Sequence, residues 1–222
     1  EISIIEILNN SNTKSPNISW EKVTSAGENT IQIGDEYFKY TYTTPEDYTK
    51  VENLTENISV VNPTEQYTYK YVGSAINNSE ETDYGDIEKY VFSNNKVTAT
   101  VRSSNSGMVK KYPDIYGGVI SNQGTIGDIT ADFLNNSIKT NTYGYASSDT
   151  SGGAIYNEGM IKSITGDFIG NSASAGGEDS VSGVAIYNKG TITSIIFSSS
   201  NPPVASLRYL EINGIVLPSS IN

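Results

Sequence analysis

The chain has 222 residues and a formal net charge of −11 at pH 7, and 36% of its residues are hydrophobic. A field of this sign repels phosphate backbones and anionic lipid headgroups, so nucleic acid is not an expected partner. Cysteine and histidine are both absent, which excludes disulfides and thiol catalysis and removes the commonest general base and transition-metal ligand. No apolar run reaches the length of a membrane span, so no direct membrane insertion by this segment is expected.

Asparagine, serine, threonine, glycine and tyrosine take the place of much of the usual apolar content. That mixture suits strands joined by turns, and no long stretch has apolar residues at helical spacing, so an all-β chain is predicted. The sequence begins at Glu1 rather than at Met. It is therefore expected to be a processed product or an excised segment.

Residues 1–111 predict a β-rich but irregular N-terminal region that includes degenerate repeats. An apolar strand is expected at 1–8, and two short strands around a Gly-Asp turn are expected at 30–42. A further candidate at 90–101 is expected to fold over at its centre. Residues 73–78 read Gly-Ser-Ala-Ile-Asn-Asn, which echoes a phrase repeated later in the chain, so this segment is a candidate degenerate coil.

A clear internal repeat occupies residues 112–200. The phrase reads Gly-Gly-Val-Ile-Ser-Asn at 117–122, Gly-Gly-Ala-Ile-Tyr-Asn at 152–157 and Gly-Val-Ala-Ile-Tyr-Asn at 183–188, so successive copies are 35 and then 31 residues apart. Such a period is typical of stacked repeat architectures. Three short strands per copy, without a helical period, predict a parallel β-helix whose coils stack about 4.8 Å apart.

Equivalent residues of successive coils are expected to lie above one another as ladders. Isoleucine recurs seven residues after the final Asn of each copy, and phenylalanine follows at eleven in the first two copies. Stacked asparagines can satisfy their buried amides on the next coil, although ordinary turn formation is the alternative reading. The predicted structural ladders are Asn122, Asn157 and Asn188; Ile129, Ile164 and Ile195; and Phe133 with Phe168.

The copies differ in length outside the shared phrases, at 138–151 and 173–182. Variable length at one corner is typical of loops that project from a stack of repeats, so loops are expected at both places. Residues 201–222 predict a terminal capping strand or hairpin around an Asn213-Gly214 turn, which would cover the last open edge of the stack.

The paired motifs Gly-Gly-Ala-Ile and Phe-x-x-Asn resemble those of autotransporter passenger regions, in particular the polymorphic outer-membrane-protein and adhesin branches. They occur at 152–155 with 168–171, and at 117–120 with 133–136. The third copy keeps only part of them, with Val184 in place of the second Gly. The resemblance covers 112–200, about two fifths of the chain. It implies a right-handed parallel β-helix, export, and display at the outer surface of a Gram-negative cell, with the membrane-anchoring barrel outside this chain.

The predicted fold, the acidic polar surface and the expected projecting loops favour a secreted, non-catalytic adhesin that binds a glycan or protein on another cell surface. Tyrosine offers amphipathic contacts to such ligands, and Tyr143 and Tyr145 are the candidate contact residues. A structural subunit of an extracellular fibre or layer is an alternative. The apolar strands at 1–8 and 207–217 suit self-association by strand addition.

A polysaccharide lyase or hydrolase is the second alternative, because many β-helix proteins cleave uronic-acid polymers. That chemistry needs clustered carboxylates, often with a bound cation, and an Arg or Lys base. The only arginines, Arg102 and Arg208, lie outside the clear repeats, so no catalytic residue, metal site or cofactor is predicted. The residues considered for this chemistry are Asp128, Asp132, Asp167 and Lys162. Asp132 and Asp167 occupy equivalent places in successive copies and are expected to stack in a row.

Overall fold

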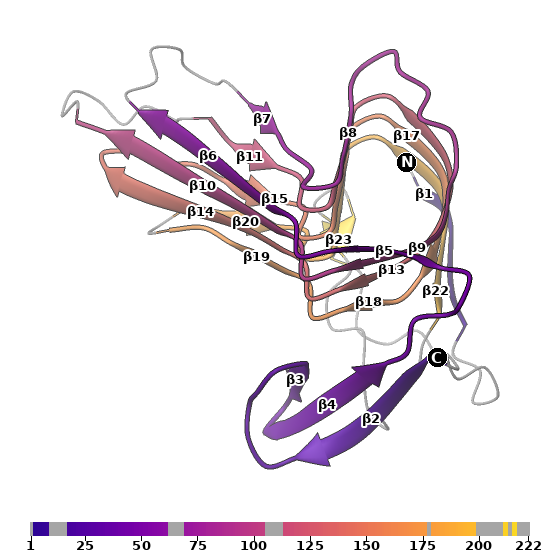
Figure 1. The fold of residues 1–222 in the computed structure, drawn as a ribbon. Coiled ribbons are helices and arrows are strands. Elements are labelled where there is room, and N and C mark those ends of the chain that lie inside the picture. The colour runs from indigo at the N-terminus through magenta and orange to yellow at the C-terminus, as the bar shows by residue number, and fades with distance from the viewer. Residues whose placement is uncertain are drawn as a thin grey trace.

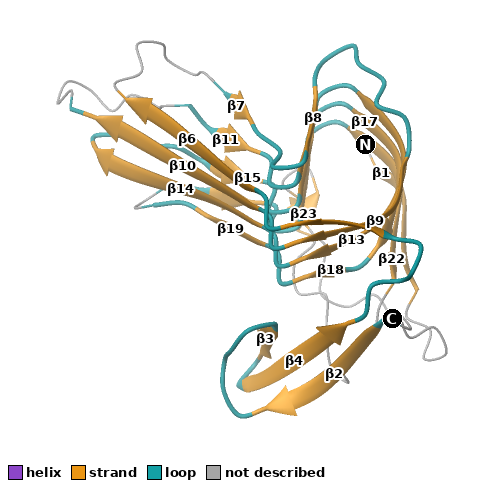
Figure 2. Ribbon diagram, viewed as in Figure 1, coloured by secondary structure: helices purple, strands orange, loops and turns teal. Residues whose placement is uncertain are grey.

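The computed structural model describes residues 2–8, 17–61, 69–104, 113–176, 179–198, 211–212 and 215–216. Within these residues every regular element is a β-strand and no helix is present, as Figure 2 shows. The predicted all-β class is therefore confirmed. This part of the chain accordingly holds no apolar helix of membrane-spanning length.

Most strands belong to four parallel sheets, and each sheet takes a strand from each successive repeat of the chain (Figure 1). We number them in the order in which the chain visits them. Sheet 1 contains β5 (Thr49–Glu52), β9 (Ile87–Ser93), β13 (Thr125–Leu134), β17 (Met160–Gly166), β18 (Phe168–Ile169) and β22 (Thr191–Ser198). Sheet 2 contains β6 (Thr55–Val61), β10 (Lys96–Ser103), β14 (Ser137–Gly144) and β19 (Ser172–Ser174). Sheet 3 contains β7 (Lys70–Tyr71), β11 (Ile115–Tyr116), β15 (Thr150–Ser151) and β20 (Val181–Ser182). Sheet 4 contains β8 (Ile76–Asn78), β12 (Ile120–Asn122), β16 (Ile155–Asn157) and β21 (Ile186–Asn188).

The repeated phrase sets the register between repeats. In sheet 4, Ile155 pairs with Ile120 on one side and with Ile186 on the other. Side chains alternate between the two faces of a strand, so pairing at this register brings residues of the same size together on the same face. The buried apolar side chains form two separate hydrophobic cores. The larger core lies between sheets 1 and 4, and a smaller one, which includes Val97 and Ile138, lies between sheets 2 and 3.

Paired repeats begin at Thr49, within the N-terminal region for which degenerate repeats were predicted. Strands β5 to β8 form the first repeat and pair with β9 to β12 of the second. Residues 73–78 belong to this first repeat, since Ile76 pairs with Ile120 and Asn78 with Asn122. The repeat was hard to recognise because a longer turn follows Asn78. The isoleucine that begins β9, Ile87, therefore comes nine residues after Asn78 instead of seven, although it still pairs with Ile129.

The segments 138–151 and 173–182 are not projecting loops, so that prediction is wrong. They contain strands of sheets 2 and 3, and each complete repeat has strands in four sheets instead of three. Ile138 and Thr140 are fully buried between these two sheets, and the Thr150 hydroxyl donates to the Thr140 hydroxyl at 2.8 Å. The narrow interior between these sheets is filled partly by small hydroxyl residues. In the sequence such strands look like polar loops, which is why loops were predicted at these segments.

A separate antiparallel sheet precedes the repeats. It consists of β2 (Ile18–Val23), β3 (Thr30–Ile33) and β4 (Glu36–Tyr42), with β4 in the centre. The predicted strand pair around the turn at Gly34 and Asp35 is confirmed as β3 and β4. The sheet is tied to sheet 1, because the Tyr42 hydroxyl donates to the Asp132 carboxylate at 2.6 Å.

The second Gly of the phrase is required where another repeat stacks on it. A Cβ added at Gly118 would overlap the carbonyl oxygen of Gly153, and one added at Gly153 would overlap that of Val184. Val184 occupies the same position in the last copy, where β21 is the final strand of its sheet, and its side chain is 51% exposed. The replacement of Gly by Val thus marks the end of the stack.

Strands from both ends of the chain lie at this last repeat. Strand β1 (Ile2–Leu8) pairs in parallel with β22, so the predicted N-terminal strand completes sheet 1 of its own chain. Strands β23 (Glu211–Ile212) and β24 (Ile215–Val216) pair antiparallel, and β23 lies beside β21. The predicted Asn213-Gly214 turn lies outside the described residues.

Candidate functional site

The three asparagines of the predicted ladder lie in one row along sheet 4, and a fourth extends it. The Nδ2 of Asn122 donates to the Oδ1 of Asn157 at 2.6 Å, and the Nδ2 of Asn157 donates to the Oδ1 of Asn188 at 2.7 Å. Asn78 donates to Asn122 in the same way at 2.7 Å. Because the four side chains are at most 3% exposed, the row ties repeats together and is not a binding surface.

A second row of asparagines, at the corner between sheets 1 and 2, was not among the predicted ladders. The Oδ1 of Asn136 accepts from the backbone N–H and the Nδ2 of Asn95 at 3.0 and 3.1 Å. The Oδ1 of Asn171 accepts from Asn136 in the same way. The signal was the Phe-x-x-Asn motif. The residue before each asparagine of this second row has a positive φ, which Asn and Gly tolerate. The φ angle is 55° at Asn94, 53° at Asn135 and 65° at Gly170.

The predicted isoleucine and phenylalanine ladders also lie in columns. Ile164 pairs with Ile129 on one side and with Ile195 on the other, and all three are fully buried. The rings of Phe133 and Phe168 are stacked with their centroids 4.6 Å apart. These columns form the larger core. They explain stability and provide no chemistry.

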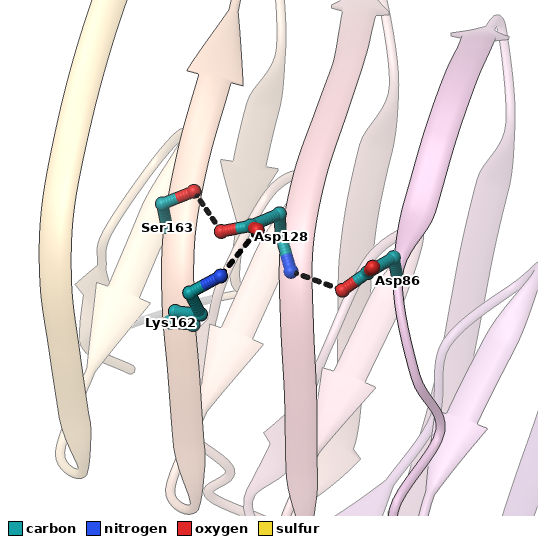
Figure 3. A network of polar contacts seen from close by, with 4 residues as sticks. All are labelled: Asp86, Asp128, Lys162 and Ser163. Atoms are coloured by element: carbon teal, nitrogen blue, oxygen red, sulfur yellow. Dashed lines mark hydrogen bonds and ion pairs between the residues drawn. The ribbon is translucent and has the colours of Figure 1, made fainter.

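Asp128 and Lys162 lie on the outer face of sheet 1 (Figure 3). The Asp128 carboxylate accepts from the Lys162 ammonium and from the Ser163 hydroxyl, each at 2.6 Å, while its backbone N–H donates to Asp86 at 2.8 Å. The hydrogen bond from Lys162, and next that from Ser163, lowers the pKa of the Asp128 carboxyl. The Lys162 side chain is 69% exposed, so the network is a surface link between three repeats.

Asp132 and Asp167 lie on neighbouring repeats as predicted from the sequence, but they do not present two free carboxylates. The Asp132 carboxylate accepts from the backbone N–H of Asp167 at 2.9 Å and from the Tyr42 hydroxyl at 2.6 Å. Burial raises the pKa of Asp132, although both hydrogen bonds act in the opposite direction. This carboxylate therefore joins sheet 1 to the antiparallel sheet.

The predicted ligand contacts Tyr143 and Tyr145 lie at the end of β14 and just beyond it. Tyr143 is 48% exposed and Tyr145 is 59% exposed. The Arg102 guanidinium lies 4.4 Å from the centre of the Tyr143 ring. Among the described residues no second aromatic ring packs against either tyrosine, so they do not form a shared surface.

Five other tyrosines come together at the corner where sheet 3 turns into sheet 4. We call them the tyrosine cluster: Tyr69, Tyr71, Tyr116, Tyr156 and Tyr187. The rings of Tyr116 and Tyr156 are nearly parallel, with centroids 4.5 Å apart and an interplanar angle of 4°. Tyr187 stacks on Tyr156 at 5.7 Å, and Tyr69 stacks on Tyr116 at 5.4 Å. The cluster is thus a continuous aromatic surface that crosses four repeats.

The position of Tyr156 follows from the strand it occupies. In β16, Ile155 faces the core and Asn157 enters the asparagine row, so the side chain between them points to the opposite face of sheet 4. The sequence signal was the Ile-Tyr-Asn segment, which occurs in two copies. It was not recognised as a site, because nothing local indicates that Tyr116 of sheet 3 folds against it.

The inner tyrosines are buried and the outer ones are open to solvent. Tyr156 is fully buried and Tyr116 is 5% exposed, whereas Tyr69 is 45% exposed. Burial, followed by the nearby Asp114 carboxylate, raises the pKa of Tyr116, whose hydroxyl donates to Asp114 at 3.2 Å. Burial also raises the pKa of Tyr156, and the charge of Glu158 adds to this effect. Both phenols therefore remain neutral at physiological pH.

One cation lies against this surface. The Lys189 ammonium is 4.7 Å from the ring centre of Tyr116 and 5.7 Å from that of Tyr69. It is also 5.8 Å from the ring centre of Tyr187 and 6.0 Å from that of Tyr156. Distances up to about 6 Å allow attraction between a cation and the electron-rich face of a ring. The cluster therefore presents an electron-rich surface to a positive charge.

A polar cavity of about 170 Å³ lies between β4 and sheet 1. Several of its lining side chains bond across it, since the Nδ2 of Asn135 donates to the Oδ1 of Asn29 at 2.7 Å. Burial raises the pKa of Tyr40, another lining residue, to about 12. These contacts make the cavity part of the joint between the antiparallel sheet and the repeats.

No group of three or more acidic side chains in the described ranges is arranged to hold a metal ion. Among the candidate sites described above, the tyrosine cluster is the one in which several aromatic rings and a cation come together. No protein-family model, no curated protein and no solved structure matches this chain.

Proposed function

We propose that this chain is a non-catalytic binding module, built on a right-handed parallel β-helix and displayed outside the cell like the autotransporter passengers that its repeats resemble. Support for the β-helix comes from four parallel sheets in which each repeat keeps the same register as the last. Such a stack is a rigid scaffold that holds outward-facing side chains in fixed rows. Its ligand is a glycan or a protein on another cell surface.

The tyrosine cluster is the observation that carries the binding function. Tyrosine combines a large apolar ring with a polar hydroxyl, and it contacts both sugar rings and protein side chains. Here the exposed ring of Tyr69 is already packed on its neighbour in the free protein, stacked on Tyr116 at 5.4 Å. Less conformational entropy is therefore lost when a ligand binds.

The test compares two exposed tyrosines, one in the cluster and one outside it. Wild type, Tyr69→Ser and Tyr145→Ser are applied to a glycan array and to intact cells. Tyr69→Ser should lower the affinity about tenfold, as expected for an aromatic anchor, and Tyr145→Ser should leave it unchanged. Loss of binding in Tyr145→Ser alone would instead place the site at Tyr143 and Tyr145. Wild-type protein that binds neither the array nor cells would contradict the proposal.

A fibre subunit is a second candidate function, supported by the position of β1. This strand adds to the edge of β22 through pairs that run from Ile2 with Ile192 to Leu8 with Ser198. The same pairing made between copies would join them head to tail. Light scattering should then show a mass that grows with protein concentration, and removal of residues 1–8 should abolish that growth. A constant monomer mass would contradict it.

We assign no polysaccharide-cleaving activity to the carboxylates considered from the sequence. Asp128 is engaged by Lys162 and Ser163, and Asp132 is engaged by Tyr42. Arg102 lies against Tyr143 on sheet 2, and Arg208 lies outside the described residues. A uronic-acid polymer incubated with the protein should therefore keep its length, as measured by size-exclusion chromatography.

A further inference from the structure

We propose that the tyrosine cluster is a cage for an organic ammonium group, and that Lys189 is a resident occupant which an external ammonium ligand displaces. This inference rests on the binding function proposed above and names the chemistry of the group that is bound. A protonated or quaternary amine is attracted to several ring faces at once, whereas a neutral group of the same shape is not.

The geometry of Lys189 shows what the cage accepts. Its ammonium lies between 4.7 and 6.0 Å from the centres of four rings, which come from sheet 3, sheet 4 and the segment before β7. No single strand could surround a cation in this way. The cage therefore exists only because four repeats are stacked in register.

Nearby carboxylates strengthen the preference for a cation. Asp114 accepts a hydrogen bond from the Tyr116 hydroxyl at 3.2 Å, and burial, together with Glu158, raises the pKa of the Tyr71 phenol. Both acids are near rings of the cage, so their charge attracts an ammonium group and repels an anion. The net charge of −11 acts in the same direction at longer range.

Lys189 is held in a way that allows replacement. It occupies the position after the last ladder asparagine, where the preceding repeats have Gln123 and Glu158, and its side chain is exposed. In the part of the chain that the structure describes, it forms no ion pair. Its charge is therefore held by the rings, and a quaternary ammonium, which is less strongly hydrated, can compete for them.

A second observation points to a ligand with a hydroxyl as well as a charge. The hydroxyl of Tyr156 is buried and has no hydrogen-bond partner among the described residues. Buried polar groups are nearly always paired in folded proteins, so this hydroxyl would gain a partner if displacement of Lys189 let a ligand hydroxyl reach it. Choline combines a quaternary ammonium with a hydroxyl, which makes it a suitable probe.

The experiment titrates the full chain with choline and with its neutral isostere 3,3-dimethylbutan-1-ol, and follows the Lys189 and tyrosine ring signals by NMR. Choline should give saturable shifts and the isostere should not. Lys189→Gln should bind choline about threefold more tightly because the internal competitor is gone, and Tyr69→Leu should bind it about threefold more weakly. Tyr145→Leu, which alters an exposed tyrosine outside the cluster, should match wild type. Circular dichroism confirms that each variant is folded.

Equal shifts with choline and the isostere would overturn the ammonium cage, as would an unchanged choline affinity in both Lys189→Gln and Tyr69→Leu. If glycans or cells are bound while choline is not, only the cage is overturned and the binding module stands. If choline is bound but no glycan or cell is, the cage stands and the proposed cell-surface function falls.

Discussion

Asn122 and Asn157 are 35 residues apart in the sequence, yet the side-chain amide of the first donates a 2.6 Å hydrogen bond to the side-chain oxygen of the second. Both residues are fully buried. No solvent can replace a bond lost there, so this contact connects the stacking of repeats to the stability of the whole chain.

Replacing Asn157 should destabilise the stack. Asn157→Ala removes one acceptor and one donor from the row, which leaves the Oδ1 of Asn188 without its donor. The free energy of unfolding should fall by about 1–3 kcal/mol, measured by urea denaturation. Asn141→Ala is the matched control, since Asn141 is half-buried in β14 and makes no side-chain hydrogen bond with the described residues. Equal losses in the two variants would contradict the role of the row.

A charge within the isoleucine column should unfold the repeats. Ile164→Asp places a carboxylate between Ile129 and Ile195, where desolvation costs several kcal/mol, comparable with the ~5–15 kcal/mol stability of a typical domain. Met160→Asp is the control in the same strand, because Met160 is 47% exposed. Far-UV circular dichroism should show lost structure in the first variant alone. Unchanged melting of Ile164→Asp would refute the core assignment.

A methyl group at Gly153 should be more harmful than a change at Val184. The Cβ of Gly153→Ala would overlap the Val184 carbonyl oxygen of the next repeat, so the backbones must separate at a cost of about 1–3 kcal/mol. Val184→Ala changes an exposed side chain at the equivalent position and should be neutral. Thermal melting measures the difference. Similar melting temperatures would show that the repeats are not in close contact there.

Removing residues 138–151 should prevent the repeats from folding. The deletion eliminates most of β14 and all of β15, so β10 and β19 in sheet 2 lose the strand that separates them. It also removes Ile138 from the smaller core. Protease resistance should be lost, whereas Lys139→Ala, an exposed change in β14, should retain it. A folded deletion variant would instead support a projecting loop.

Alkaline pH should destabilise the protein through the tyrosine cluster. The pKa values of Tyr71, Tyr116 and Tyr156 are raised above the usual 10.0, mainly by burial. Above pH 10 the unfolded chain therefore releases protons that the folded chain retains. This stabilising contribution is fully present below pH 10 and is lost as the pH rises further. Melting temperatures and tyrosinate absorbance should change together, and ionisation of all 16 tyrosines in the still-folded protein would contradict this.

Stacking along the axis was predictable because it depends on periodicity alone. Ile129, Ile164 and Ile195 follow their asparagines at one offset, and that offset survives in the pairing. Residues 73–78 were predicted only as a candidate degenerate coil, because the turn before Ile87 is longer, which breaks the offset without breaking the pairing. Sheets 2 and 3 were not predicted because their interior includes the buried threonines Thr140 and Thr150, joined by a hydrogen bond from the Thr150 hydroxyl. Strands with buried polar residues of this kind resemble polar loops in the sequence.

The sequence by itself determined the all-β class and the rows of like residues, since both follow from local composition and a repeated spacing. Only the tertiary structure decided the cross-section of each repeat and therefore the tyrosine cluster. The bend between sheets 3 and 4 passes through Gly117, whose φ of 112° is open to glycine and strained for other residues. That bend aims Tyr116 at Tyr156, and Lys189 of the last repeat lies over both rings. The direction of a side chain at a corner depends on backbone torsion angles, which a repeated phrase does not specify.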